Sequence, residues 1–278
     1  MLWPGQASAA TISIEPLRQE IELAPGQTIA KSLIVFNASA NAETVNVDAT
    51  SFNTVDKHYD YAFGNPPDLS GWIQLIENQA AIPPYSQHIF NYNVAVPNNA
   101  EPGGAYIAVF ASTRDPVAAL DRSTTVVERI GSLIYLTVSG QETKRGSLLS
   151  YATPKISFSR SNTWDLQVQN KGNTHFDSQI TIRVRQWFGR TVASSTADHL
   201  ILPGTIREMN GQYRLGRLPN LYHIQVAVGL GDNPAARTNR WLLYLPPLPS
   251  LVTLGLFSLI VGLMTRKLRR GRLKRSSG

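Results

Sequence analysis

Residues 222–230 read Tyr-His-Ile-Gln-Val-Ala-Val-Gly-Leu, and this stretch decides the fold class. Large apolar residues occupy every second position from 222 to 230, and His223 and Gln225 lie between them. A period of two residues places all the large apolar side chains on one face of an extended strand. The stretch therefore predicts a half-buried β-strand, with His223 on the opposite face.

The same period recurs along much of the chain. Phe90, Tyr92, Val94 and Val96 alternate with smaller or polar residues, and Pro97 ends that pattern. Further strands are expected at residues 29–36, 45–52, 106–111, 132–139, 164–168, 180–184 and 241–245. Short strands separated by polar turns are typical of antiparallel sandwiches. We predict an all-β fold with two Ig-like antiparallel β-sandwich domains.

The length of 278 residues suggests two domains. The polar, glycine-bounded segment 140–147 (GQETKRGS) is the best boundary, so the first sandwich is predicted over residues 11–146 and the second over 147–247. The chain contains no cysteine, which excludes disulfides, thiol catalysis and cysteine-ligated metal.

Residues 248–265 form an uncharged, mostly apolar run of the length needed to cross a membrane. As a helix, 18 residues would span about 27 Å, close to the roughly 30 Å bilayer core. Seven Lys and Arg residues follow in the tail 266–278. Positive charge marks the cytoplasmic side, so we predict a transmembrane helix, a cytoplasmic tail and extracellular domains. A buried core helix is the alternative, although no second long helical pattern exists to pack with it.

The first ten residues include Ala7-Ser8-Ala9, which fits a signal-peptidase site. We interpret residues 1–10 as the remnant of a signal peptide; a disordered terminus is the alternative. Both ends of the chain thus predict a single-pass protein of the cell membrane.

The sequence pI of about 9.7 raises the possibility of nucleic-acid binding. The charge distribution argues against it, because residues 11–146 carry a net −6, residues 147–247 a net +6 and the tail +7. The net charge of the whole chain, +7, therefore equals the charge of the tail, because the charges of the two domains cancel. The positive second domain could face anionic lipid, wall phosphate or solvent.

Catalytic motifs are missing from the sequence. None of the five histidines has metal-ligand spacing, and no nucleophile-elbow or nucleotide-binding motif occurs. Asp56, His58 and Asp60 alternate, which fits either a metal site or a polar loop. We predict that the chain is not an enzyme and has no catalytic residue, metal or cofactor.

Aromatic residues in the loop-rich stretch 56–72 are the candidate ligand contacts. Tyr59, Tyr61 and Trp72 could stack on sugar rings, since long loops often carry binding residues. The alternatives are that Trp72 fills the core and that the tyrosines are structural. Asn37-Ala38-Ser39 also matches an N-glycosylation triplet.

Several short motifs, in their order, resemble the WxL-interacting protein family of bacterial cell-surface proteins. They lie at residues 12–16, 23–27, 34–37, 71–73, 94–97, 102–106, 168–175, 188–190 and 201–204. The resemblance spans most of residues 11–265. It implies a peptidoglycan-binding first domain and a second domain that binds surface proteins, host proteins or WxL proteins. The family's glycan-contacting residues have no one-to-one match here.

These observations predict a non-enzymatic, membrane-anchored adhesion or scaffold protein of the bacterial cell envelope. Its expected partners are cell-wall peptidoglycan and surface proteins, with no nucleic acid. The alternative is a pilus-type chaperone or assembly factor, which would complete a subunit's fold by adding a strand. The predicted anchor is unlike those chaperones, which are soluble.

Overall fold

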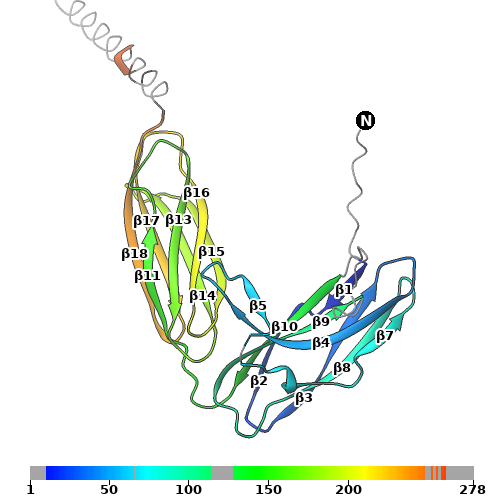
Figure 1. The fold of residues 1–278 in the computed structure, drawn as a ribbon. Coiled ribbons are helices and arrows are strands. Elements are labelled where there is room, and N and C mark those ends of the chain that lie inside the picture. Colours follow the sequence, from blue (N-terminus) through cyan, green and yellow to red (C-terminus); the bar gives the residue numbers. More distant parts are fainter. Residues whose placement is uncertain are drawn as a thin grey trace, which may run out of the picture. The chain divides into compact units, whose positions relative to one another are not determined.

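The computed structural model describes residues 11–65, 67–113, 128–247, 252, 255 and 258–260 (Figure 1). The regular secondary structure of these residues is almost entirely strand, with one 3-10 helix, η1 (Ser70–Trp72), and helical positions at 252, 255 and 258–260. The all-β prediction is confirmed. Within this described part, no helix is long and apolar enough to cross a membrane. Most of the predicted span 248–265 lies outside it, as do the predicted signal remnant 1–10 and the tail 266–278.

The chain forms two compact units. Unit 1 contains residues up to 145 together with two later segments, 170–176 and 201–207. Unit 2 contains 146–169, 177–200 and the residues from 208 onward. The division near residue 146 lies beside the boundary expected from the sequence, but the two later segments were not expected in the first unit.

Unit 1 is a sandwich of two sheets (Figure 1). One sheet has the strand order β1 (Ile12–Glu15), β3 (Thr28–Asn37), β8 (Gln87–Ala95), β6 (Ile73–Leu75). The other has the order β2 (Arg18–Leu23), β10 (Arg129–Val138), β9 (Gly103–Ser112), β4 (Glu43–Thr54), β5 (Tyr61–Phe63), and β7 (Gln79–Ile82) also pairs with β4. Among the described residues of this unit, the paired strands are antiparallel except β2 and β10, which are parallel.

The chain changes sheets between β1 and β2. Pro16 and Leu17 connect these two strands, and the peptide bond between Glu15 and Pro16 is cis. Before this connection, β1 extends the four-stranded sheet, and after it β2 lies along β10 in the other sheet.

The core of unit 1 lies between the two sheets. Phe90 and Val94 are fully buried and Tyr92 is 1% exposed, as their alternation predicts. Ile107 and Ile134 contribute fully buried side chains from the opposite sheet. Removing this apolar surface from water is the main favourable contribution to the stability of the sandwich.

Unit 2 contains a three-stranded and a five-stranded sheet. The first has the order β11 (Gly146–Ala152), β13 (Ser161–Asn170), β16 (Ile206–Arg214). The second has the order β12 (Ile156–Ser157), β18 (Asn233–Tyr244), β17 (Asn220–Leu230), β14 (Phe176–Gln186), β15 (Thr191–Ile201). The predicted stripe on β17 is confirmed, because its five large apolar side chains are all at most 7% exposed.

Asn37, in the predicted glycosylation triplet, is a buried structural residue. Its side chain is 0% exposed, and Nδ2 donates hydrogen bonds to the carbonyl oxygens of Asn41 (2.7 Å), Ile82 (3.0 Å) and Pro83 (3.1 Å). Oδ1 accepts a hydrogen bond from the Ser39 amide at 2.9 Å. The amide of Asn37 is therefore fully used inside the fold and is closed to an attached glycan.

Candidate binding surface

Tyr59 does not lie at an open loop tip, contrary to the expectation from the sequence. Its side chain is 7% exposed, and its hydroxyl contacts Thr205 Oγ1 at 2.6 Å and accepts a hydrogen bond from the Leu202 amide at 2.7 Å. The guanidinium of Arg207 lies 4.2 Å from the ring centroid. Burial raises the pKa of Tyr59 above its usual value. Its ring is covered within unit 1 and is not available for stacking on a sugar.

The other two candidate residues have different environments. Trp72, at the end of η1, is half-buried and packs against the core of unit 1, which fits the core-filling alternative. Tyr61 lies on β5 and is 38% exposed.

The alternating stretch Asp56–Asp60 forms a polar turn. The carboxylate of Asp56 accepts hydrogen bonds from the amides of His58 (2.9 Å) and Asp60 (3.4 Å). The described part of the chain contains no group of three potential ligands that could hold a metal ion. The polar-loop alternative therefore describes this segment.

Tyr61 belongs to an aromatic cluster on the outer face of the six-stranded sheet. The cluster consists of Phe52, Tyr61, Phe63, Tyr106, Phe110 and Tyr135. The β4–β5 hairpin brings Phe63 against Phe110, with ring centroids 5.0 Å apart. Tyr106, Phe110 and Tyr135 are at most 9% exposed, whereas Tyr61 and Phe63 are 38% and 41% exposed. The cluster is thus a second apolar core with two accessible rings at its rim.

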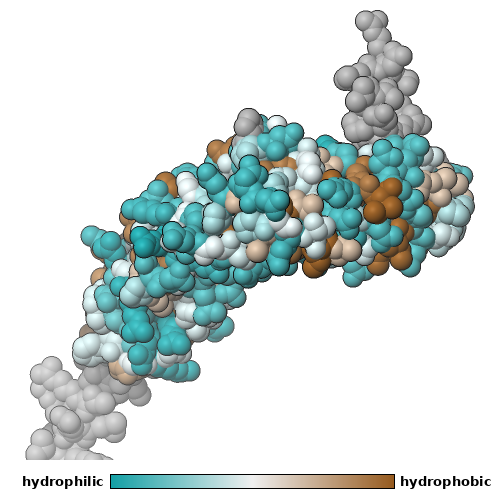
Figure 2. All heavy atoms as spheres, turned by 90° about the horizontal axis from the view of Figure 1, so that it is seen from below, coloured by the Kyte–Doolittle hydropathy of each residue, from teal (hydrophilic) through white to brown (hydrophobic). Residues whose placement is uncertain are grey.

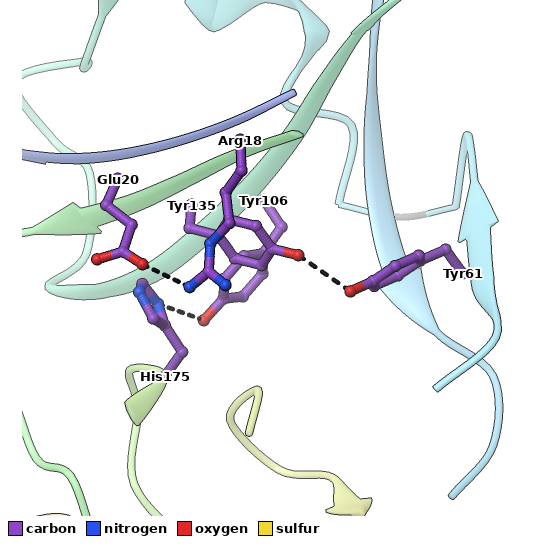
Figure 3. A network of polar contacts seen from close by, with 6 residues as sticks. All are labelled: Arg18, Glu20, Tyr61, Tyr106, Tyr135 and His175. Atoms are coloured by element: carbon purple, nitrogen blue, oxygen red, sulfur yellow. Dashed lines mark hydrogen bonds and ion pairs between the residues drawn. The ribbon is translucent and has the colours of Figure 1, made fainter. Parts of the chain in front are cut away.

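Polar groups border the cluster (Figure 3). The hydroxyls of Tyr61 and Tyr135 are 3.0 Å apart, and the Tyr106 hydroxyl lies 3.2 Å from His175 Nδ1. Arg18 forms an ion pair with Glu20, and its guanidinium lies 4.7 Å from the centroid of the Tyr135 ring. Burial raises the pKa of Tyr106 and of Tyr135 well above the usual range. These tyrosines are neutral hydrogen-bonding groups.

Gly131 makes close packing of the cluster possible. A Cβ atom at this position would lie 2.7 Å from Cε1 of Phe110, the residue opposite Gly131 on β9. The Phe110 ring therefore lies over bare backbone. Arg129 covers the same ring, with its guanidinium 3.8 Å from the centroid and Nη2 2.7 Å from the carboxylate of Asp48.

Among the described residues, no strand pairs with the first four residues of β10 on the side away from β9, and we call this side the free edge. The parallel pairing with β2 begins at Leu133, whose amide donates to the Leu17 carbonyl at 2.9 Å. Alternation along β10 directs the backbone groups of Arg129 and Gly131 to that same side, away from β9. No other described residue supplies a backbone hydrogen bond there. The free edge is a consequence of the sheet change at Pro16, which turns the chain away from β10.

The start of β1 lies beside this free edge without joining its sheet. The carboxylate of Glu128 accepts hydrogen bonds from the amides of Thr11 (2.6 Å) and Ile12 (3.3 Å), and from the Thr11 hydroxyl. A side chain, not a backbone ladder, connects the two sheets here. The arrangement offers main-chain donors and acceptors to an extended segment, next to the Phe110–Phe63 end of the aromatic cluster.

Comparison with known proteins gives structural similarity only. No family model matches this chain, and no curated protein matches it. Among solved structures, it is similar to the class 5 fimbriae chaperone CfaA, with a TM-score of 0.44, 9% identity, and coverage of 82% of this chain and 98% of that chain.

Two other similar structures were found. One comes from a chaperone–tip adhesin complex of CFA/I fimbriae, with a TM-score of 0.43, 10% identity, and coverage of 83% of this chain and 99% of that one. The other is the E. coli chaperone DraB, with a TM-score of 0.41, 10% identity, and coverage of 82% of this chain and 95% of that one.

Proposed function

We propose that this chain is a non-enzymatic protein of the bacterial cell envelope that binds an extended segment of a surface-protein partner. The partner segment adds a strand to the free edge of β10 in unit 1. The supporting observation is the pair of edge-facing backbone positions, Arg129 and Gly131, which have no strand partner among the described residues on the side away from β9. Main-chain hydrogen bonds supply affinity in this mode of recognition, and flanking side-chain sites supply specificity.

The neighbouring side chains favour a particular kind of segment. On the outer face, the Phe110 ring lies over Gly131 and contacts the exposed Phe63 ring, so an apolar side chain of the partner could pack against the Phe63 ring beside it. Arg129 already pairs with Asp48, yet its guanidinium remains partly exposed and would favour an acidic residue nearby. We therefore expect an extended partner segment that carries an apolar side chain near Phe110 and an acidic side chain near Arg129.

The sequence motivates the cellular setting of this function. The uncharged run 248–265 and the basic tail suit a single-pass anchor with units 1 and 2 outside the cell. An anchored module of this kind would hold surface proteins at the membrane during display or assembly.

A proline substitution at the free edge tests this function. Arg129→Pro removes an edge-facing amide without removing a ladder bond to β9, and proline is tolerated at the first residue of a strand. Arg129→Ala is the matched control, because it removes the same guanidinium but keeps the amide. The full chain in detergent would be incubated with envelope extract, and captured proteins identified and quantified.

We expect a partner that wild type and Arg129→Ala both retain and that Arg129→Pro loses. Hydrogen exchange of the purified complex should then show protection of the amides at 129 and 131. Equal capture by all three proteins, or protection confined to another surface, would refute strand addition at this edge.

A second candidate function is binding of cell-wall glycan by the rim of the aromatic cluster. Tyr61 and Phe63 are the observation that favours it, because their exposed rings could stack on sugars. Binding of the full chain to purified sacculi should then persist at high salt and fall in a Tyr61→Ala, Phe63→Ala double variant. Binding abolished by salt would instead indicate attraction by basic residues.

A further inference from the structure

Unit 2 carries an exposed apolar row across four neighbouring strands. Most of the surface seen in Figure 2 is hydrophilic, with hydrophobic residues in separate patches. In unit 2, Ile156 on β12 is paired with Leu243 on β18, and Leu243 with Leu221 on β17. The amide of Trp187, just after β14, donates to the Leu221 carbonyl at 2.9 Å. These four side chains are 57%, 38%, 38% and 70% exposed, in that order.

Trp241 and His223 extend this row on the same face, and Phe188 lies at the same end of the sheet. Trp241 is 50% exposed and stacks on His223, with ring centroids 4.5 Å apart and an interplanar angle of 24°. The two residues are paired across β17 and β18, and Arg185 follows on β14. Phe188, next to Trp187 in the β14–β15 turn, is 64% exposed. We call Ile156, Trp187, Phe188, Leu221, Trp241 and Leu243 the apolar end of unit 2.

The rest of this sheet face is polar and basic. Moving along the paired strands away from the apolar end, the next outward positions hold Arg183, Gln225 and Asn239. Arg237 follows beside Ala227. The face thus changes from apolar and aromatic at one end to arginine-rich in its middle.

The apolar end coincides with the point where the chain leaves the sheet. β18 ends at Tyr244, one residue after Leu243, and only Leu245, Pro246 and Pro247 precede the uncharged run 248–265. β14 and β18 both run antiparallel to β17, so the β14–β15 turn with Trp187 lies at the same end as Tyr244. The apolar end is therefore within a few residues of the segment predicted to enter the bilayer.

We infer that the apolar end of unit 2 is a membrane-contact surface, and that it lies at the boundary between phospholipid head groups and acyl chains. This inference rests on the membrane placement in the proposed function. Tryptophan is suited to this boundary, because its ring is apolar while the indole N–H can still reach water or lipid oxygen. Phenylalanine and leucine suit the acyl-chain side of the boundary, because they are wholly apolar. Arginines further along the face could contact lipid phosphate, since a guanidinium matches phosphate geometry.

A three-residue connector makes this contact geometrically accessible. Three extended residues reach roughly 10 Å at most, so the end of β18 cannot be far from the start of the uncharged run. If that run enters the bilayer, exposed side chains at this end of the sheet reach the interfacial region without additional chain. Neither a second copy nor another protein is needed to cover them.

The absence of cysteine allows a direct test with single labelled positions. Trp187→Cys, labelled with an environment-sensitive fluorophore, reports on the apolar end, and Trp187 is exposed enough that the substitution should not disturb folding. Ala235→Cys is the matched control, since it is exposed on β18 near the strand's opposite end. The full chain would be reconstituted in vesicles of phosphatidylcholine and phosphatidylglycerol, with and without head-group spin-labelled lipid. Flotation of the vesicles reports membrane attachment independently.

We expect the labelled chain to float, the probe at 187 to show blue-shifted emission that spin-labelled lipid quenches, and the probe at 235 to remain water-like and unquenched. Flotation with water-like emission at both positions would overturn the contact surface while leaving the membrane placement intact. Blue-shifted emission at 187 without lipid quenching would also overturn it, because protein would then cover the site. Failure to float would refute the membrane placement, and the inference with it.

Discussion

Replacing Asn37 by aspartate tests the buried amide that holds the β3–β4 connection to the end of β7. Asn37→Asp keeps the shape of the side chain but replaces the Nδ2 donor by an oxygen. That oxygen would face the carbonyl oxygens of Asn41, Ile82 and Pro83, now 2.7–3.1 Å from Nδ2. The variant therefore replaces attraction by repulsion at a site with no exposed side-chain surface.

The expected loss of stability follows from the number of hydrogen bonds. The two N–H groups of Nδ2 donate to three carbonyls, so at least two hydrogen bonds are lost; the one to Ile82 is buried and those to Asn41 and Pro83 are partly buried. Each buried acceptor left without a partner costs about 1–3 kcal/mol, which gives roughly 2–6 kcal/mol in total. For a unit of this size, roughly 2–4 °C of melting temperature corresponds to each kcal/mol. We expect the melting temperature of unit 1 to fall by about 10 °C.

Asn41→Asp is the control, because Asn41 lies in the same turn with an exposed side chain and undergoes the same chemical change. A surface substitution of this kind should change the free energy of unfolding by about 0.5 kcal/mol or less. Urea and thermal unfolding of both variants, followed by circular dichroism, measure the difference. Equal stability of the two variants would refute the assignment of Asn37 as a structural residue.

The pH dependence of the Asn37→Asp variant provides a second check. Burial raises the pKa of the introduced carboxyl above its unfolded value of about 3.9. The variant's deficit should therefore be complete at neutral pH and shrink as the pH falls through the folded pKa, because the protonated carboxyl can donate one hydrogen bond again. A deficit that grows on acidification would contradict this reasoning.

Two further predictions concern the core and the buried tyrosines. Val226→Asp would bury a carboxylate on the β17 stripe, where Val226 is 2% exposed, and should unfold unit 2; native-like circular dichroism and thermal stability would show that the stripe is misassigned. Burial raises the pKa of Tyr106 and Tyr135, so above the unfolded value of about 10 the unfolded state loses protons first and stability falls. For each such tyrosine, the free energy of unfolding should fall by roughly 1.4 kcal/mol per pH unit above pH 10 and should not change below it. Urea unfolding of Tyr135→Phe should show a smaller fall in stability per pH unit than wild type. An unchanged pH dependence would contradict the burial effect.

Strands could be predicted from the sequence because apolar residues at every second position identify the buried face of each strand. Phe90, Tyr92 and Val94 alternate in the sequence, and the structure buries all three. Tyr59 shows where such reasoning ends. Its burial depends on Leu202 and Thr205, which are 143 and 146 positions away in the chain, so no local pattern reports it. Asn37 is a similar case, since the sequence Asn-Ala-Ser does not distinguish an exposed glycosylation triplet from a buried hydrogen-bonding site.

The free edge also required knowledge of strand pairing. In the sequence, residues 132–139 read as a central strand, and nothing marks Arg129 and Gly131 as lacking a neighbour. Glycine within a strand does signal a close approach by another group. Here that signal corresponds to the Phe110 ring over Gly131, so the glycine is explained by packing, and the edge follows from where β2 begins.

The two exposed edges on this side of the six-stranded sheet differ in a way that favours binding at only one of them. On β2, the residues whose backbone faces outward are Arg18, Glu20 and Glu22, and closely spaced charges oppose pairing with another strand. On the start of β10, the outward-facing residues are Arg129 and the bare Gly131, and the Arg129 charge is already paired with Asp48. The β2 edge is therefore the less suited of the two to pairing with another strand, and the proposed extended segment would bind at the short β10 edge, which has no strand partner among the described residues.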